Sequence, residues 1–451
     1  MRYTRFLSML DTWALTDPAL PALRYAGAEG LETLTYAALA EAVRGRAEAL
    51  LNSSTGCLGV LCDGSAACVI EILAAAAAGI QTALLDGLAD EGVLSGQIAA
   101  ADVDTLWGDG ELCEALSPTL RSGPVKRSGD ILFFTSGTAQ AARAVALTEE
   151  SLCASAWNGG ALLPLAPGDV LLCMLPLNHV FGFVCGLLWG LSCGACVALG
   201  RGPRHYADDC ACFKPTALPS VTMLLDFLTR ANALNPELKL VLVGAGPCPA
   251  PLLESVKARG IRVSFGYGLT ETSSGVALSL GDDPYAMTVC PDDRVMIALD
   301  GEILIEAPTC VMRGYYNAPE ATAAVLQGGV LHTGDLGSLD GEGRLRITGR
   351  KKDMLVLRDG TKLFLPEYEA RLAQALPGRD FAVLEIDGRP ALILRGREEE
   401  REAVSAALAP AMAEQSRGRQ LSKIVFLSEP LPRSATGKIK RWELQQKVVN
   451  A

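Results

Sequence analysis

The sequence predicts an α/β protein in which a large layered α/β domain with a β-rich subdomain precedes a small α+β C-terminal domain. Short apolar runs typical of buried strands alternate with helical stretches over roughly the first 285 residues. After that point, short strands separated by glycine and aspartate turns replace the alternation. At 451 residues, of which 49% are hydrophobic, the chain is long enough for about three domains or subdomains.

The elements of the first part can be assigned in chain order. Residues 66–79 are expected to form a packed helix that ends at a glycine, followed by a strand at residues 80–85. A buried strand at residues 131–134 leads into a glycine-containing loop, and a helix begins at Glu149. Further strands are expected at residues 170–175, 216–219, 238–243 and 262–265, with helices at 221–233 and 251–259. This alternation indicates a largely parallel sheet.

The later part contains shorter elements and a domain boundary. We place that boundary between a large domain at residues 1–349 and a small domain at residues 350–451. Strands of the β-rich subdomain are expected at residues 294–298, 302–306 and 344–348. The small domain is expected to contain a helix at 366–376, strands at 380–386 and 390–394, a solvated helix start within 397–402 and a last strand near Ile424.

Charge and cysteine content restrict the possible classes of function. The net charge of −11 and the pI near 5.0 imply no dominant basic surface, so nucleic acid is not expected as a partner. The N-terminal segment has no apolar leader, and a cytoplasmic location is therefore expected. The 14 cysteines are expected to be reduced and largely buried. A zinc site is the alternative for one group of residues, namely Cys193, Cys196, His205, Cys210 and Cys212.

An uncharged stretch from Val180 to Gly200 is long enough to cross a bilayer. Glycines interrupt it repeatedly, and its last residues are typical of a short buried strand. We therefore expect a buried helix, a turn and a strand in an α/β layer, and no integral membrane span. A membrane anchor is the alternative interpretation.

Four motifs in one order along the chain carry the chemistry. Thr135–Thr138 is a hydroxyl-and-glycine loop after an apolar strand, a composition suited to cradling phosphate. Thr270 and Glu271 place a hydroxyl beside a carboxylate that can hold Mg²⁺. Asp335 and Arg350 pair an acid that can bind ribose hydroxyls with a base that can reach a phosphate or ribose, and Lys438 follows a glycine turn. Nucleotide-dependent activation of an acid needs this set of groups.

Together with residues 176–179, 301–303 and 314–317, these motifs resemble the adenylate-forming superfamily of acyl-CoA synthetases, adenylation domains and luciferases. The resemblance extends from about residue 35 to residue 441, and residues 349–357 look most like fatty acyl-CoA and acyl-carrier-protein synthetases. It implies an ATP- and Mg²⁺-dependent ligase that adenylates a medium- or long-chain fatty acid, or a similar apolar acid. The acyl group would then pass to the pantetheine thiol of CoA or of an acyl or peptidyl carrier protein, after the small domain turns about a hinge.

The resemblance also implies roles for individual residues. Binding of the nucleotide falls to Thr135, Ser136, Gly137, Thr138, Arg143, Gly244, Ala245, Gly246, Tyr267, Gly268, Asp335, Arg350 and the hinge residue Lys352. Catalytic roles fall to Lys438, Thr270, Glu271 and His179, with Glu271 as the metal ligand. Tyr267 would stack on adenine, Thr270 would contact the α-phosphate, and Lys438 would contact the α-phosphate and the substrate carboxylate. His179 would either gate the acyl pocket or simply pack.

The phosphate loop departs from the pattern of this superfamily after Thr138. The usual Thr-Gly-x-Pro-Lys-Gly is replaced by residues 139–144, in which Arg143 keeps the charge of the lysine but not its compact geometry. Losing one charge-assisted contact costs about 1.5–3 kcal/mol, which predicts a slower enzyme or a differently set loop. The alternative is a catalytically weakened nucleotide or acyl binder with a regulatory role.

Basic residues near the C-terminus allow two interpretations. Arg433, Lys438, Lys440, Arg441 and Lys447 are accompanied in sequence only by Glu443. They form either a docking patch for an acidic carrier protein or CoA phosphates, or the solvated face of a terminal helix.

Overall fold

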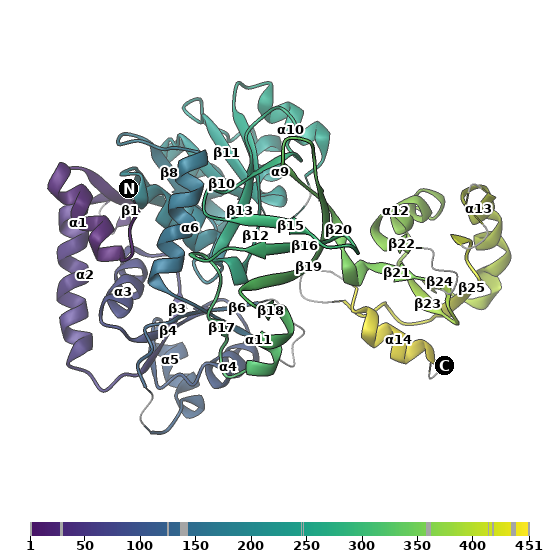
Figure 1. The fold of residues 1–451 in the computed structure, drawn as a ribbon, viewed down its shortest axis with the longest axis horizontal. Helices are drawn as coiled ribbons and strands as arrows, with labels where there is room; N and C mark the ends of the chain where they lie inside the picture. Colours follow the sequence, from purple (N-terminus) through teal and green to yellow (C-terminus); the bar gives the residue numbers. More distant parts are fainter. Residues whose placement is uncertain are drawn as a thin grey trace. The chain divides into compact units, whose positions relative to one another are not determined.

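The computed structural model describes residues 2–27, 30–123, 126–135, 143–244, 246, 248–357, 362–413, 415–416, 419–433 and 439–449. The chain divides into two compact units (Figure 1). The first comprises residues 1–333 and 338–346, and the second comprises residues 334–337 and 347–451. Both units mix helices and strands, which confirms the α/β class expected from the sequence.

The larger sheet joins a parallel half to an antiparallel half. Its order is β15 (Arg294–Ile297), β16 (Glu302–Glu306), β19 (Val330–Leu339), β20 (Leu345–Arg350), β14 (Met287–Val289), β13 (Ser274–Ser279), β12 (Arg262–Leu269), β11 (Leu240–Gly244), β10 (Ala217–Val221), β8 (Val170–Cys173), β9 (Cys196–Leu199), β1 (Pro21–Gly27) and β2 (Gly30–Thr35), with β18 (Leu326–Gln327) beside β19. The pairings from β1 to β12 are parallel. The pairings of β12 with β13, β13 with β14 and β14 with β20 are antiparallel. Strands β14, β15, β16, β18, β19 and β20, all beyond residue 285, therefore extend the main sheet from β13.

A second sheet of the first unit carries the ends of the phosphate loop. Its order is β17 (Gly314–Tyr315), β7 (Ala144–Leu147), β6 (Ile131–Phe134), β4 (Gln81–Asp86), β3 (Cys57–Cys62) and β5 (Thr105–Trp107). Strand β6 pairs in parallel with β4 and antiparallel with β7, and β7 in turn pairs antiparallel with β17. The loop expected after residue 134 is thus held at both ends by one hairpin.

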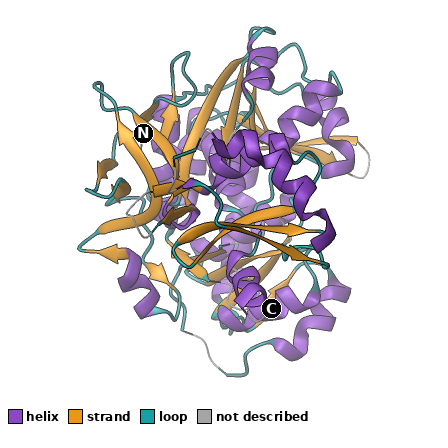
Figure 2. Cartoon of the chain, turned by 90° about the vertical axis from the view of Figure 1, so that its right-hand side faces the viewer, coloured by secondary structure: helices purple, strands orange, loops and turns teal. Residues whose placement is uncertain are grey.

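Helices pack against the strands of this unit (Figure 2). They are α1 (Phe6–Thr16), α2 (Tyr36–Leu51), α3 (Ala66–Ala77), α4 (Glu91–Ala100), α5 (Gly110–Leu116), α6 (Glu149–Leu162), α7 (Trp189–Ser192), α8 (Tyr206–Phe213), α9 (Thr222–Arg230), α10 (Ala250–Lys257) and α11 (Pro319–Val325). Helix α3 ends before Gly79, whose φ of 67° is easily adopted by glycine, as the sequence predicted. Helix α6 begins at a capping box formed by Thr148 and Ser151.

The uncharged stretch from Val180 to Gly200 forms a π-helical segment, η2 (Phe181–Leu188), followed by α7, a turn and β9. Gly182, Gly186, Gly190 and Gly194 are spaced four residues apart, and each lies so close to other residues that a Cβ atom would not fit without movement. A Cβ atom on Gly186 would lie 2.9 Å from the Cys173 sulfur, and one on Gly190 would lie 2.7 Å from Val197. The glycines therefore bring this segment close to β8 and β9. Within the described part of the chain, no helix is long and apolar enough to cross a membrane.

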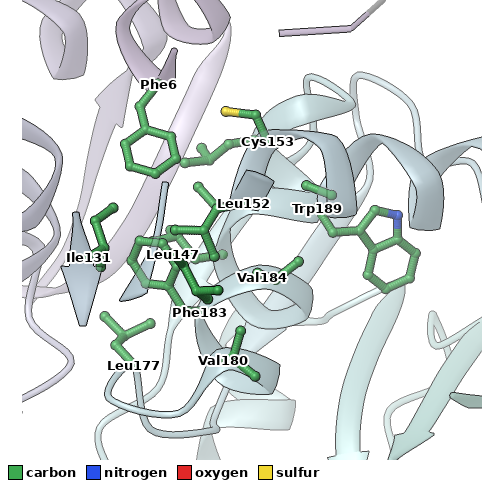
Figure 3. Close-up of a cluster of buried hydrophobic side chains, with 14 of the residues drawn as sticks. Phe6, Ile131, Leu147, Leu152, Cys153, Leu177, Val180, Phe183, Val184 and Trp189 are labelled. Carbon is green, nitrogen blue, oxygen red and sulfur yellow. The ribbon is translucent and has the colours of Figure 1, made fainter. Parts of the chain in front are cut away.

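The main core lies where α1, the β6–β7 hairpin, α6 and η2 meet (Figure 3). Phe183 is fully buried, and its ring centroid lies 6.1 Å from that of Phe6 and 5.7 Å from that of Phe133. The sequence pattern predicted no element in the N-terminal segment. Because α1 contributes Phe6 to this cluster, that segment is part of the core.

The second unit contains two small sheets and several helices. They comprise β21 (Met354–Val356), β22 (Lys362–Phe364), α12 (Leu365–Ala375), β23 (Phe381–Ile386), β24 (Arg389–Arg395), the 3₁₀ turn η6 (Glu398–Glu400), α13 (Arg401–Ala413), β25 (Lys423–Leu427) and α14 (Arg441–Val449). Strand β24 pairs antiparallel with β23 and parallel with β25. The glutamates of η6 lie directly before α13, as expected for a solvated helix start.

Three of the described C-terminal basic residues pair with acids that are distant in sequence but belong to the same unit. Arg433 lies 2.5 Å from Asp380, Arg441 lies 2.6 Å from Glu369, and Lys447 lies 3.1 Å from Glu429. The premise that they are balanced only by Glu443 was wrong, because acids distant in sequence fold against them. This neutralisation favours the solvated helix over a docking patch.

The described residues contain no group of three or more histidine, cysteine or acidic side chains placed to hold a metal ion. Every member of the cluster considered for zinc lies within the described range. Cys196 and Cys210 are buried, and burial raises the pKa of both thiols. These two cysteines pack as small apolar residues.

Candidate active site

The two ends of the phosphate loop lie side by side at the tip of the β6–β7 hairpin. The backbone N–H of Thr135 donates a hydrogen bond to the carbonyl oxygen of Arg143, with a distance of 3.1 Å between N and O. Arg143 is exposed and Thr135 is partly exposed. Ser136, Gly137 and Thr138 lie outside the described residues. The hairpin therefore holds a hydroxyl and a cation at the two ends of this loop.

A tight turn at the end of β12 holds the second motif. Tyr267 is buried, and β12 is irregular between Tyr267 and Gly268. A Cβ atom on Gly268 would lie 1.7 Å from the carbonyl oxygen of Ser274, so only glycine allows this close approach of β13. Thr270 and Glu271 follow in a 3₁₀ turn, η4 (Thr270–Thr272), where both are partly exposed. The backbone carbonyl of Glu271 accepts a hydrogen bond of 2.8 Å from Met312.

The carboxylate of Glu271 is held by a neutral donor. The Tyr315 hydroxyl donates a hydrogen bond of 2.7 Å to Oε1 of Glu271. The guanidinium carbon of Arg143 lies 5.4 Å from the centroid of the Tyr315 ring. Burial is the largest cause that raises the pKa of the Tyr315 phenol, and the charge of Glu271 adds to it. The phenol therefore stays protonated and remains a donor at neutral pH.

His179 lies directly before η2. The residue is exposed, yet the surrounding protein lowers the pKa of its imidazole, and the charge of Asp86 at the end of β4 offsets part of this effect. At neutral pH the ring is therefore largely neutral and carries no charge to attract a carboxylate. This state suits a side chain that lines or gates a pocket.

Two of the glycines expected near adenine occupy different environments. Gly244 ends β11, and a Cβ atom there would lie 2.7 Å from the Phe181 ring. Gly246 is exposed with a φ of 158°, and a Cβ atom added to it would meet no heavy atom within 4 Å. Ala245 lies outside the described residues. Gly244 thus lets an aromatic ring of η2 approach the end of the parallel sheet.

A small cavity lies behind these motifs. Its volume of about 20 Å³ suits a single water molecule. Its walls include Cys185 and Trp189 after His179, Leu242 before Gly244 and Gly275 after Glu271. Ser155 also lines it, is 3% exposed, and has no hydrogen-bond partner for its hydroxyl among the described residues. The cavity therefore presents an apolar surface with one unused hydroxyl.

The remaining candidates belong to the second unit. Asp335 is 3% exposed, and its Oδ1 lies 2.9 Å from Nε of the half-exposed Arg350. The sequence placed these two residues at one ribose, and the structure brings them together. Lys352 is exposed in the 3₁₀ turn η5 (Lys351–Asp353), directly after β20. Lys438 lies outside the described residues.

Sequence reasoning gave no role to Tyr315, although the segment 314–317 contributed to the family resemblance. The sequence alone carried no signal for this, because Tyr315 comes near Arg143 only through its pairing with Val145, two residues beyond Arg143. Recognising it required the antiparallel pairing of β17 with β7, which brings together residues separated by about 170 positions in the sequence.

Comparisons with known proteins agree with this geometry. The profile of the family described as AMP-binding enzyme matches residues 124–316. The 2-succinylbenzoate–CoA ligase of Bacillus cytotoxicus is 31% identical over 348 residues, covering 70% of this chain and 69% of the relative. The 3-[(3aS,4S,7aS)-7a-methyl-1,5-dioxo-octahydro-1H-inden-4-yl]propanoyl:CoA ligase of Mycobacterium tuberculosis is 30% identical, covering 70% and 66% of the two chains.

Solved structures show the same fold. The O-succinylbenzoate coenzyme A synthetase of Bacillus subtilis in complex with AMP superposes with a TM-score of 0.79 at 23% identity. The match covers 97% of this chain and 98% of the other.

Proposed function

Because the chain belongs to the AMP-binding enzyme family, we propose that it is an ATP-dependent acid–CoA ligase. In the first step, a substrate carboxylate oxygen bonds to the α-phosphorus of ATP, and the bond to the leaving pyrophosphate breaks. In the second step, the thiol of CoA loses its proton and its sulfur attacks the acyl-adenylate carbonyl, releasing AMP.

The observation that carries this proposal is the joint placement of the loop and the carboxylate. Thr135 and Arg143 pair at the loop ends, Arg143 lies over the ring of Tyr315, and the Tyr315 hydroxyl binds Glu271. Phosphate oxygens at the loop would therefore lie near a carboxylate able to hold their metal ion.

The residues present fit Mg²⁺ and ATP. Glu271 is a hard oxygen donor that is partly exposed, and among the described residues only Tyr315 bonds its carboxylate. When bound, Mg²⁺ would neutralise charge on the phosphates. Asp335 would accept hydrogen bonds from ribose hydroxyls, Arg350 would support the nucleotide, and Lys438 would neutralise the substrate carboxylate. Turning of the small domain about Lys352 would switch the enzyme from the adenylation step to the thioester-forming step.

For the acid, we place a ring-bearing carboxylic acid ahead of the fatty acid that the sequence suggested. The two relatives described above act, by name, on a benzoate and on a bicyclic propanoate. Both relatives are CoA ligases by name, which favours CoA over a carrier protein as acceptor.

The test is thioester formation followed by mass spectrometry. Purified protein is incubated with ATP, Mg²⁺, CoA and one acid from a panel that contains 2-succinylbenzoate, benzoate, anthranilate, octanoate and palmitate. We expect acyl-CoA from a ring-bearing acid. Acyl-CoA from octanoate or palmitate alone would restore the fatty-acid assignment, and product only on a pantetheinylated carrier protein would exclude CoA as acceptor.

The altered phosphate loop favours a second function. Residues 139–144 lack the glycines and the lysine usual in this loop, which is compatible with a regulatory nucleotide binder. Such a protein would bind MgATP in calorimetry but would form no acyl-adenylate with any acid.

A further inference from the structure

One side chain joins the two charged groups of the first unit's site. Tyr315 donates its hydroxyl to Glu271, and Arg143 lies over its ring. The tyrosine is only 8% exposed, and its backbone N–H donates a hydrogen bond of 2.9 Å to the Thr322 hydroxyl. The backbone of Tyr315 is therefore held in place, and its side chain has two charged neighbours.

A phenol suits a metal-binding carboxylate better than a base does. A lysine or arginine in its place would neutralise the negative charge of Glu271 and compete with a cation. A neutral hydroxyl fixes one carboxylate oxygen while the charge of the group is kept. The other oxygen is then presented in one orientation, which is the role of an outer partner of a metal ligand.

The same ring explains how an arginine can serve at the end of this loop. A planar guanidinium stacks on an aromatic face, whereas a compact ammonium has no such planar fit. Arg143 precedes β7 directly, and β7 pairs with β17, which carries Tyr315. The Tyr315 ring therefore provides a surface on which the side chain of Arg143 packs, and Arg143 takes the place of the lysine that is usual in this loop.

We propose that Tyr315 is a positioning residue that couples the cation of the phosphate loop to the metal-binding carboxylate. This proposal rests on the proposed function, because it assumes that Glu271 holds Mg²⁺ beside ATP. This role requires no contact of Tyr315 with substrate or metal, because Tyr315 acts by fixing the orientation of Glu271 and the position of Arg143.

The test compares two adjacent tyrosines, each changed to phenylalanine. Tyr315→Phe removes the hydroxyl that holds Glu271 and keeps the ring. Tyr316→Phe removes the hydroxyl of the next residue, which donates instead to Asp102 at 3.1 Å. The readout is the Mg²⁺ concentration that gives half-maximal ATP binding in calorimetry, and thermal unfolding of both variants reports on folding.

We expect Tyr315→Phe to raise the half-saturating Mg²⁺ concentration roughly ten-fold, as for loss of one hydrogen bond to a charged group. Tyr316→Phe should leave it within about two-fold of wild type. Equal Mg²⁺ dependence in both variants would overturn the positioning role. If wild type binds ATP equally well without Mg²⁺, or not at all, the metal assignment of Glu271 and the proposed function fail with it.

A double-variant experiment tests the coupling to Arg143. Arg143→Lys keeps the charge but loses the planar contact with the ring. If the phenol couples the two groups, adding Tyr315→Phe to Arg143→Lys should raise the half-saturating Mg²⁺ concentration by less than Tyr315→Phe does in wild type. Independent, multiplicative effects would show that Tyr315 serves Glu271 alone.

Discussion

The two units treat their charged motif residues in opposite ways. In the first unit the motif carboxylate, Glu271, is held by a neutral phenol and, among the described residues, forms no ion pair. In the second unit Arg350, Arg433 and Arg441 each lie against an acid. A carboxylate whose partner is a neutral phenol remains available to bind a cation. An arginine that is paired with an acid can bind a ligand only while it also binds that acid. This contrast agrees with our proposal that Glu271 of the first unit holds the metal ion and that the Asp335–Arg350 pair of the second unit contacts the nucleotide.

Removing the charge of Glu271 should have the largest effect. We expect Glu271→Gln to lower the rate of ATP–pyrophosphate exchange by roughly 10²–10³-fold. The uncharged amide binds Mg²⁺ more weakly than the carboxylate does, and Mg²⁺ stabilises the charge that develops in the transition state. Glu306→Gln, which changes a partly exposed carboxylate on β16, is the matched control and should retain the wild-type rate. Similar rates in both variants would contradict the assignment of the metal to the first unit.

The paired acid of the second unit should matter less for rate and more for ATP binding. Asp335→Asn should raise the KM for ATP by about ten-fold or more, because Asp335 is nearly fully buried against Arg350. Asp340→Asn is the control, since Asp340 pairs with Arg344 in a solvated turn. An unchanged KM for Asp335→Asn would remove Asp335 from the nucleotide site.

The close packing of the uncharged stretch can be tested in the same comparative way. Gly190→Ala places a Cβ atom 2.7 Å from Val197 and should lower the free energy of unfolding of the first unit by about 1–3 kcal/mol. Gly92→Ala in α4 meets no heavy atom within 4 Å and should be neutral or raise that free energy by about 0.5–1 kcal/mol. Thermal unfolding checks both, and destabilisation by Gly92→Ala instead would undermine the packing argument.

The smallest effect is expected at a carboxylate outside the site. Burial, with a further contribution from Asp292, raises the pKa of Asp293 to about 7 from 3.8, and neither carboxylate oxygen has a hydrogen-bond partner among the described residues. Since the folded pKa is raised, the stability linked to Asp293 is present below about pH 4 and is lost as the pH rises through about 7. Asp293→Asn should therefore stabilise the protein at pH 8 by roughly 1–2 kcal/mol and have little effect at pH 4.

Thermal unfolding of Asp293→Asn across pH measures this effect. The exposed Asp282→Asn is its control and should show no such pH-dependent difference. Equal stabilisation of Asp293→Asn at both pH values would show that the ionisation of Asp293 is not the cause.

Local pattern in the sequence predicted many elements of both units, although it predicted none before residue 66. The strand at residues 302–306 and the helix after residue 149 appear where periodicity and capping residues placed them. The sequence could not show that Asp380 and Glu369 neutralise Arg433 and Arg441, because these pairs form only when distant elements pack.

The same limit applied to the site. Residue type and spacing predicted Glu271 as a metal ligand and the pair of Asp335 and Arg350 as nucleotide contacts. The role that we propose for Tyr315 could not be predicted from the sequence, because it depends on the pairing of β17 with β7. The sequence could not distinguish a fatty acid from a ring-bearing acid, because apolar residues near His179 favour an apolar acyl group without indicating its shape.

The most direct test of the central claim is ATP–pyrophosphate exchange measured without CoA, in the presence and absence of Mg²⁺ and of each acid of the panel. Formation of an acyl-adenylate predicts exchange that requires both Mg²⁺ and one class of acid, and that collapses in Lys438→Ala. Binding of MgATP with no exchange for any acid would contradict the account and identify the protein as a nucleotide-binding homologue without ligase activity.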